Sequence, residues 1–423
     1  MRLAGLSIEN FKPFSKRIDI ELAPLTVLIG RNSSGKSALA RLPVLVGRAL
    51  SQDARSPIEL DVSGIDFGAS FLDLVHNRVP HGSIGLGAKF VDGDRRIGFH
   101  STIQHVDELM LQVVSKSEWH SPEFSGTLTW LGREPLADPG FYTVEQALGA
   151  PAECTASFRG LLPAAVISLG EFDWKTRLAA LRDSMSRAFD GMGYLGPFRE
   201  APQRQYRFPG GLPESVGVSG REAPALLGAD FIRKGGQVLS QVGEWFKRYL
   251  GGWPLSISRV GDTFSLVLVS PDKENVEINL SDVGTGLTQV LPLVVQRVFE
   301  EMTGKGGGIE IVEQPELHLH PAAHGPLADL YIAASAHPSA CMIIETHSEN
   351  FVLRLRRRIA EGLDPKRVKL YWVNDSVRPG SRIEEIIIHS NGDVSNWPAS
   401  VFSEDFEEVK AIRQAQRSQG REG

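Results

Sequence analysis

The alternation of hydrophobic and polar residues gives the first third of the chain a β-rich character. Residues 17–22 alternate apolar and polar positions with period two, residues 3–12 form a largely apolar segment with a polar end, and residues 25–29 form a short, β-branched apolar run. All three segments are predicted strands. From about 60 to 150, short alternating segments are separated by Gly, Pro and Asp, a pattern typical of an antiparallel sheet. Antiparallel strands are predicted at 82–90, 94–100 and 126–130.

The rest of the chain is predicted to begin with helices and to end with strands that alternate with helices. A loop rich in Gly, Pro and Arg at 194–213 separates the first two helices, and the charged tail from about 404 is predicted to be a surface helix. Alternation of strand and helix implies a parallel sheet, so the predicted fold class is α/β. The predicted helices are 171–190, 222–250, 322–336 and 349–361. The predicted strands are 255–259, 263–269, 275–280, 308–312, 340–345, 369–373 and 383–389.

One eight-residue motif indicates a nucleotide-binding site. Residues 30–37 match the phosphate-binding loop G-x-x-x-x-G-K-[ST], between the apolar strand at 25–29 and a helix that opens at Ala38. Glycines let backbone N–H groups converge on a phosphate; Lys36 would reach the β- and γ-phosphates and the Ser37 hydroxyl would bind Mg²⁺. We therefore predict that ATP and Mg²⁺ bind here. The predicted phosphate-binding residues are Gly30, Arg31, Asn32, Ser33, Ser34, Gly35, Lys36, Ser37 and Ala38.

Two strand ends and one helix start are further candidates for this site. Glu313 ends an apolar strand, where a carboxylate would suit Mg²⁺, and His347 ends the next one, where an imidazole could contact a γ-phosphate or the attacking water. At 280–292, Ser and Gly residues open an apolar helix, which favours anion binding. Ser-Asp before a helix is also an ordinary N-cap, so this last signal is weak by itself.

Composition narrows the class of protein without deciding its function. The 423 residues are 42% hydrophobic and 23% charged, as in ordinary globular domains, and the net charge of −6 disfavours a general nucleic-acid-coating protein. Its two cysteines, Cys154 and Cys341, form no disulfide or metal pattern and suit a reducing compartment. No segment has the length of a membrane span and no signal peptide is apparent, so we expect a cytoplasmic protein without a membrane partner.

In the order phosphate loop, Ser/Gly helix start, acidic strand and histidine strand, these motifs resemble the ABC-type ATPase heads, the group that contains SMC, RecF and OLD (overcoming lysogenization defect) proteins. The run Ile-Glu-Asn-Phe-Lys-Pro-Phe at 8–14 is similar to the start of those heads. The run Glu-Gln-Pro-Glu-Leu-His-Leu-His-Pro at 313–321 is most similar to prokaryotic OLD-like ATPases, which are often described as AAA-family. Residues 194–200 and the Trp-Pro segment at 391–398 resemble one branch with a C-terminal module of unknown function.

The resemblance implies a P-loop NTPase head with a mixed or parallel sheet, an antiparallel β subdomain and a helical insertion. It also implies a homodimer in which each ATP lies between the phosphate loop of one subunit and the signature helix of the other. Glu313 and Ser37 would hold Mg²⁺, and His347 would be the switch histidine. Ser281, Asp282, Gly284 and Gly286 would meet the partner's γ-phosphate. The implied parts are 1–60 and 256–375 for the ATPase head, 61–150 for the β subdomain, 151–255 for the insertion and 376–423 for the C-terminal module.

Two departures from the family pattern bear on activity. Gln314 stands where the water-activating base is expected, and an amide has no basic site near neutral pH, although it can orient water. Glu316 could compensate or merely cap the following segment, and His347 could also place the water. OLD proteins usually continue into a Toprim nuclease, yet the 76 residues after His347 contain no D-x-D, and Asp375 is an isolated candidate in a predicted surface loop. We therefore expect slow ATP hydrolysis and no intrinsic nuclease.

Three functions are compatible with these motifs. The first is an ATPase subunit of a prokaryotic defence or DNA-damage system that gates a separate effector, such as a nuclease or toxin. The second is a RecF-like repair protein that binds DNA through Arg199, Arg204 and Arg207, although these arginines also suit a surface loop or a nucleotide-sensing contact. The third is a regulatory scaffold that binds ATP without hydrolysing it.

Overall fold

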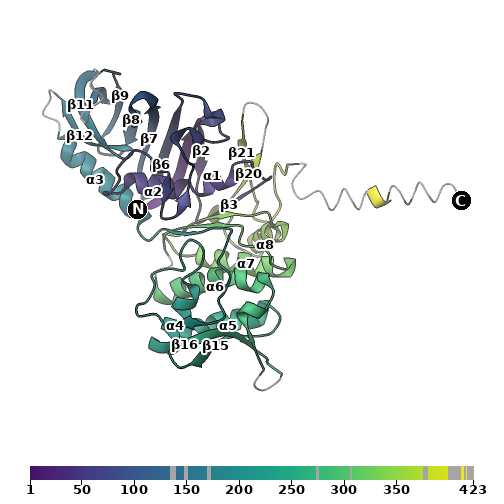
Figure 1. Cartoon of the computed structure of the whole chain (residues 1–423). Coiled ribbons are helices and arrows are strands. Elements are labelled where there is room, and N and C mark those ends of the chain that lie inside the picture. Colours follow the sequence, from purple (N-terminus) through teal and green to yellow (C-terminus); the bar gives the residue numbers. More distant parts are fainter. Residues whose placement is uncertain are drawn as a thin grey trace.

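The chain folds into two lobes (Figure 1). The computed structural model describes residues 1–133, 140–146, 151–168, 173–272, 276–304, 307–374, 380–398, 411–413 and 416. Strand β3 (Leu25–Gly30) lies between the two hydrophobic cores, because Leu28 packs in one core while Leu25, Val27 and Ile29 pack in the other. All six residues of β3 are buried, which explains its uninterrupted apolar sequence.

The sheet that contains β3 is mostly parallel and carries the candidate site. Its order is β13-β18-β19-β3-β20-β21, and every neighbouring pair is parallel except β20 with β21. The α/β P-loop class predicted from the sequence is therefore confirmed. Parallel strands end at the same edge, so β18, β19 and β3 present their carboxyl ends together. The other strands are β13 (Gly193–Leu195), β18 (Ile309–Glu313), β19 (Cys341–Glu345), β20 (Val368–Asn374) and β21 (Arg382–Ile386).

The second sheet is antiparallel, has nine strands in the order β12-β11-β10-β9-β8-β7-β6-β1-β2, and forms the upper lobe in Figure 1. The N-terminal strands β1 and β2 belong to this antiparallel sheet and not to the sheet that contains β3. The period-two pattern of β2 is the one that antiparallel sheets favour. The strands are β1 (Arg2–Glu9), β2 (Ile18–Glu21), β6 (Ser83–Asp92), β7 (Arg95–Val106), β8 (Leu111–His120), β9 (Ser125–Trp130), β10 (Gly140–Gln146), β11 (Ala152–Arg159) and β12 (Leu162–Ser168).

Strands β11 and β12 also correct the predicted start of the helical insertion at 151. They form a hairpin whose turn uses Gly160 in the left-handed region (φ 62°), and helix α3 (Trp174–Ser186) packs against β12. The described antiparallel sheet therefore extends to Ser168, beyond the predicted boundary at 150. The division of the chain into five parts otherwise remains a prediction.

The lower lobe packs helices against the parallel sheet and a small antiparallel one (Figure 1). The predicted helix at 222–250 is two helices, α4 (Ala223–Arg233) and α5 (Gln237–Tyr249), because Gly235 and Gly236 both take positive φ between them. The remaining helices are α1 (Lys36–Ala40), α2 (Leu42–Leu50), α6 (Thr285–Thr303), α7 (Pro321–Ala334) and α8 (Glu349–Ala360). The small sheet contains β14 (Tyr206–Arg207), β15 (Leu255–Val260), β16 (Thr263–Val269) and β17 (Glu277–Asn279), and a separate hairpin pairs β4 (Asp61–Val62) with β5 (Ile65–Asp66).

The described part of the C-terminal region packs on the lower lobe. Ile386 and Ile388 are buried in its core, and Trp397 lies under the Arg356 guanidinium. Asp375 and most of the predicted tail helix lie outside the described residues. None of the helices in the described part of the chain combines the length and hydrophobicity that crossing a lipid bilayer requires.

Candidate functional site

The phosphate loop connects β3 to α1, and its shape depends on Gly35. Gly35 has φ 102°, a conformation that side chains rarely adopt, and a Cβ there would come within 2.5 Å of Pro13 Cγ. Pro13 and Phe14 therefore pack directly on the loop, which gives the 8–14 run a local role in supporting it. Ser33 is also in the left-handed region (φ 61°).

A pocket of about 370 Å³ opens beside this loop. Lys36 is buried at its floor, with Nζ donating to the carbonyl oxygens of Gly30 (3.1 Å) and Arg31 (2.6 Å), and burial lowers the pKa of its ammonium group. The predicted residues Asn32, Ser33, Gly35, Lys36, Ser37, Ala38, Gln314 and His347 all line this pocket, together with Lys12, Arg41 and Glu345. The structure thus brings the phosphate loop together with Gln314 and His347, although these follow the loop by about 280 and about 310 residues in the sequence.

Glu313 lies at the predicted strand end, but its carboxylate is already engaged. It is only 2% exposed, and the Arg41 guanidinium donates to both oxygens, from Nε to Oε1 (2.5 Å) and from Nη2 to Oε2 (2.8 Å). The Tyr194 hydroxyl donates to Oε1 as well (2.9 Å). Hydrogen bonding to Glu313 raises the pKa of Arg41, and burial followed by the Glu313 charge raises the pKa of Tyr194, so both keep their protons.

Glu345 is a residue of this site that the sequence analysis missed. It ends β19 directly opposite Glu313 in the parallel register, is 2% exposed and lines the pocket. Burial, and secondarily the Glu313 charge, raise the pKa of this carboxyl to about 7, against the opposing effects of the Ser37 hydrogen bond and the Lys36 charge. The available signal was that the strand at 340–345 ends in a glutamate, as the strand at 308–313 does. The sequence also indicated that Arg41 could belong to the site, since it follows Ser37 by four residues and helical spacing places both on one face.

The backbone of Gln314 is held in an unusual conformation. Its φ is 46°, its N–H donates to the Glu345 carbonyl oxygen (2.7 Å), and Arg199 Nη2 donates to its carbonyl oxygen (3.1 Å) and to that of Glu313 (2.9 Å). Arg199 is 6% exposed, so it holds the acidic strand end from inside the protein and does not present its charge to DNA. These bonds direct the Gln314 side chain to the pocket wall.

His347 and Glu316 have different surroundings. Partial burial, and then the Lys36 charge, lower the pKa of His347 to about 4, so its imidazole is neutral at pH 7. Glu316 is buried, burial raises its pKa, and its Oε1 accepts from the His347 N–H (2.6 Å). Glu316 does not line the pocket; it fixes the backbone at His347 instead.

The four signature residues, which are predicted to meet the partner's γ-phosphate, lie outside this pocket. They are Ser281, Asp282, Gly284 and Gly286. Ser281 donates to Asn279 Oδ1 through its N–H (3.0 Å) and its hydroxyl (2.8 Å), and the exposed Arg204 pairs with Asp282. Gly284 caps α6 and has open space where a Cβ would be, whereas a Cβ on Gly286 would overlap the His318 carbonyl oxygen. One contact joins this region to the site, because Gln289 Nε2 of α6 donates to the Arg199 carbonyl oxygen (3.0 Å).

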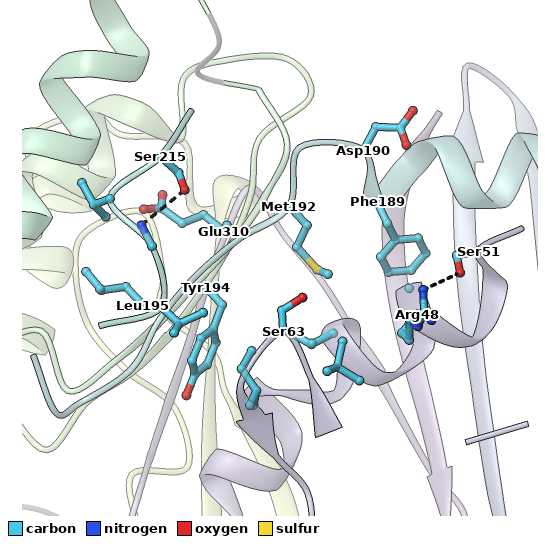
Figure 2. A pocket seen from close by; sticks show the side chains of 18 of the residues that line it. Arg48, Ser51, Ser63, Phe189, Asp190, Met192, Tyr194, Leu195, Ser215 and Glu310 are labelled. Carbon is cyan, nitrogen blue, oxygen red and sulfur yellow. Dashed lines mark hydrogen bonds between the residues drawn. The ribbon is translucent and has the colours of Figure 1, made fainter. Parts of the chain in front are cut away.

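A second cavity, of about 320 Å³, is bordered by Tyr194 (Figure 2). Its wall includes α2, the β4–β5 hairpin, β13 and residues 215–218, and Glu310 of β18 reaches it. Tyr194 borders this cavity, and its hydroxyl donates to Glu313 Oε1. This cavity contains no phosphate-loop residue and is not the nucleotide site.

Comparison with known protein families agrees with the motifs of the site. A family model described as AAA ATPase domain matches residues 1–98 and 236–352, which together make up half of the chain. The chain belongs to this AAA ATPase domain family. The matched segments include the phosphate loop, the signature, the acidic strand and His347. No match was found among curated proteins.

Several solved SMC head domains are similar in structure to this AAA ATPase-family chain at low sequence identity. One, an SMC head bound to the C-terminal winged-helix domain of ScpA, has 13% identity and a TM-score of 0.49, with 92% of this chain and 98% of that one covered. The head from Thermotoga maritima has 15% identity and a TM-score of 0.41, covering 91% and 99%. A head with an extended coiled coil, bound to a ScpA domain derived from Pyrococcus furiosus, has 11% identity and a TM-score of 0.43, covering 97% and 99%.

Proposed function

We propose that this chain binds ATP with Mg²⁺, hydrolyses it slowly, and uses the bound nucleotide to control a dimer that gates a separate effector. The observation that carries this proposal is the pocket formed by the phosphate loop, the strand-end carboxylate of Glu345, Gln314 and His347. The AAA ATPase family membership supports nucleotide binding independently of that geometry. The prokaryotic defence or DNA-damage setting, the OLD-like branch, the cytoplasmic location and a nuclease or toxin as effector remain predictions.

The residues of the pocket suit a nucleoside triphosphate and a hard cation. Residues 30–38 would surround the phosphates, and the buried Lys36 ammonium provides the positive charge next to them. Ser37 and Glu313 offer oxygen atoms of the type that Mg²⁺ prefers. When bound, Mg²⁺ would neutralise the negative charge that develops on the transferred phosphoryl group.

Slow turnover follows from the groups available to activate water. Gln314 can orient water but cannot accept a proton. His347 has a pKa of about 4 and is a weak base, while Glu316 does not line the pocket and accepts the backbone N–H of His347 at Oε1. General-base catalysis typically contributes ~10²–10⁴-fold, and its absence would leave an ATP-bound state that persists long enough to be recognised by a partner.

The dimer proposal depends on the signature residues. Ser281, Asp282, Gly284 and Gly286 do not line the pocket of their own subunit, so they are available to complete a neighbour's site. Gly284, at the N-cap of the 19-residue helix α6, is the position with open space for an approaching phosphate. Gly286 has a separate role within the subunit, because its hydrogen faces the His318 carbonyl group.

Of the alternatives, the non-hydrolysing scaffold has the more specific support. Pairing of Glu313 with Arg41, together with an amide at 314, would suit a protein that binds ATP without turnover. Direct DNA binding is less well supported, since Arg199 is buried and the exposed Arg204 pairs with Asp282; Arg207 is exposed as well.

Substitution of Lys36 tests nucleotide binding. Lys36→Ala removes a charge-assisted interaction worth roughly 1.5–3 kcal/mol, so ATP affinity should fall about 10- to 150-fold in a folded protein. Lys16→Ala is the matched control, because Lys16 is exposed and does not line the pocket. Equilibrium binding of a fluorescent ATP analogue measures both, and an unchanged affinity for the Lys36 variant would refute the proposed site.

A further inference from the structure

The two carboxylates at the strand ends differ in how their oxygens are satisfied. Glu313 accepts three hydrogen bonds, two from Arg41 and one from Tyr194. Glu345 lies beside it, is equally buried, and has a Ser37 hydrogen bond, but its Oε2 atom has no partner among the described residues. The unpartnered oxygen belongs to a side chain that lines the phosphate-loop pocket.

A buried carboxylate oxygen without a partner is costly, and a cation is the ligand that removes this cost most directly. Mg²⁺ is commonly bound through one or two protein carboxylates while waters and substrate phosphates complete its octahedron. Ser37, the predicted metal-binding hydroxyl, lines the phosphate-loop pocket together with Glu345, whereas Glu313 does not line it. Within the described residues no group of three or more His, Cys, Asp or Glu side chains gathers for a metal, so a site here would rely on this small set of oxygens.

We infer that Glu345 is a direct ligand of the Mg²⁺ that accompanies the nucleotide, beside Ser37, while Arg41 and Tyr194 hold Glu313 at the edge of the same site. This inference rests on the proposed function, because the metal is the one that arrives with ATP or ADP. It adds a carboxylate from β19 to the one predicted on β18.

A different role for Glu345 would be general base in place of Gln314. The geometry favours the metal: Glu345 lines the same pocket as Ser37, and the hydrogen bond that joins residues 345 and 314 is between main-chain atoms. The two roles also differ in their consequences, since loss of a base lowers turnover at full metal occupancy, whereas loss of a ligand lowers metal affinity.

The test compares the full-length protein with Glu345→Gln. Mn²⁺ binding in the presence of saturating ADP is followed by electron paramagnetic resonance, and ADP affinity is measured separately in EDTA. Loss of groups that merely support a metal ligand typically weakens metal affinity by ~10–100-fold, so loss of a direct ligand should weaken Mn²⁺ binding by at least about tenfold. ADP affinity in EDTA should be unchanged or higher, because a negative charge near the phosphates is removed. Glu301→Gln, an exposed carboxylate at the end of α6, is the control for charge alone.

Several results would overturn the inference and can be told apart. Mn²⁺ affinity equal to that of the parent would refute Glu345 as a ligand, and equal Mn²⁺ affinity with lost hydrolysis would identify it as the base. A parent protein that binds no nucleotide would instead refute the proposed function itself. Should Glu345→Gln fail to fold, Glu345→Asp keeps the charge but withdraws the carboxylate by one methylene, and it should still weaken Mn²⁺ binding more than ADP binding in EDTA.

Discussion

Replacing Glu345 by glutamine should stabilise the nucleotide-free, metal-free protein at alkaline pH. The folded-state pKa of about 7 lies above the ordinary value of 4.5 because the carboxylate is buried beside Glu313. Below pH 4.5 the group is protonated in both the folded and the unfolded chain, so it has no effect on the free energy of unfolding. Between pH 4.5 and 7 only the unfolded chain ionises, so stability falls as pH rises; above pH 7 both states are ionised and the loss is complete.

The size of this loss follows from the shift in pKa. A shift of one unit corresponds to 1.36 kcal/mol, so the shift at Glu345 amounts to roughly 3 kcal/mol at pH 8, and to less than about 1 kcal/mol at pH 5. Glutamine keeps the size of the side chain and can still accept from the Ser37 hydroxyl, but it has no charge to desolvate. The free energy of unfolding of Glu345→Gln should therefore exceed that of the parent by roughly 3 kcal/mol at pH 8, and the two should converge near pH 5.

Chemical denaturation in EDTA at pH 5 and at pH 8 measures this difference, with Glu301→Gln as the exposed control. Because the chain has two lobes, unfolding should be followed by two probes, and free energies compared only where the transitions coincide. Parallel pH dependence in parent and Glu345→Gln, or a variant that is less stable at pH 8, would refute the account of Glu345 as an unpaired buried charge. Such a result would also weaken the case for a cation at this oxygen.

Two further predictions address assembly and turnover. Gly284→Leu should leave ATP binding and stability nearly unchanged but prevent ATP-dependent dimerisation. Gly286→Leu should instead destabilise the subunit itself, because its side chain would overlap the His318 carbonyl group. Analytical ultracentrifugation with and without ATP, together with thermal unfolding, distinguishes the two effects, and an ATP-dependent dimer of the Gly284 variant would rule out the composite site. The isolated protein should hydrolyse ATP well below the median enzyme rate of ~10 s⁻¹. Gln314→Glu should raise that rate or leave it unchanged, and Glu313→Ala and His347→Ala should lower it. Fast phosphate release that does not depend on His347 would show that another group activates water.

The local motifs were predictable from the sequence because their structure depends on neighbouring residues. The run at 25–37 contains its strand, its loop and the start of its helix in one continuous segment, and the structure has all three. The strands at the C-terminal end of the chain were equally clear, since buried parallel strands have uninterrupted apolar sequences. The assignment of strands to sheets was less certain: β1 pairs with β6, about 80 residues away, and period-two alternation does not say which partner a strand will have.

The contacts that modify the site were not predictable, because they join distant segments. Arg41 and Glu313 are 272 residues apart in sequence, and nothing local indicates that one holds the other. Glu345 escaped notice for a related reason: its importance comes from the register that places it opposite Glu313, and register between parallel strands is a property of the assembled sheet. Arg199 appeared as one of several loop arginines, and only its burial distinguishes it from Arg204 and Arg207.

The structure also explains why Gln314 can be altered without disturbing its surroundings. A φ of 46° is unfavourable for a residue with a side chain, and here hydrogen bonds of the Gln314 main chain with Glu345 and Arg199 compensate. Arg199 in turn accepts a hydrogen bond from Gln289 of the signature helix. None of these bonds uses the Gln314 side chain, so Gln314→Glu changes the chemistry at the pocket wall while the backbone remains fixed. A change in hydrolysis rate in that variant would consequently report the missing base itself. The same bonds connect Gln314 to both the proposed metal ligand and the proposed dimer contact, which are the two elements that bound nucleotide would engage.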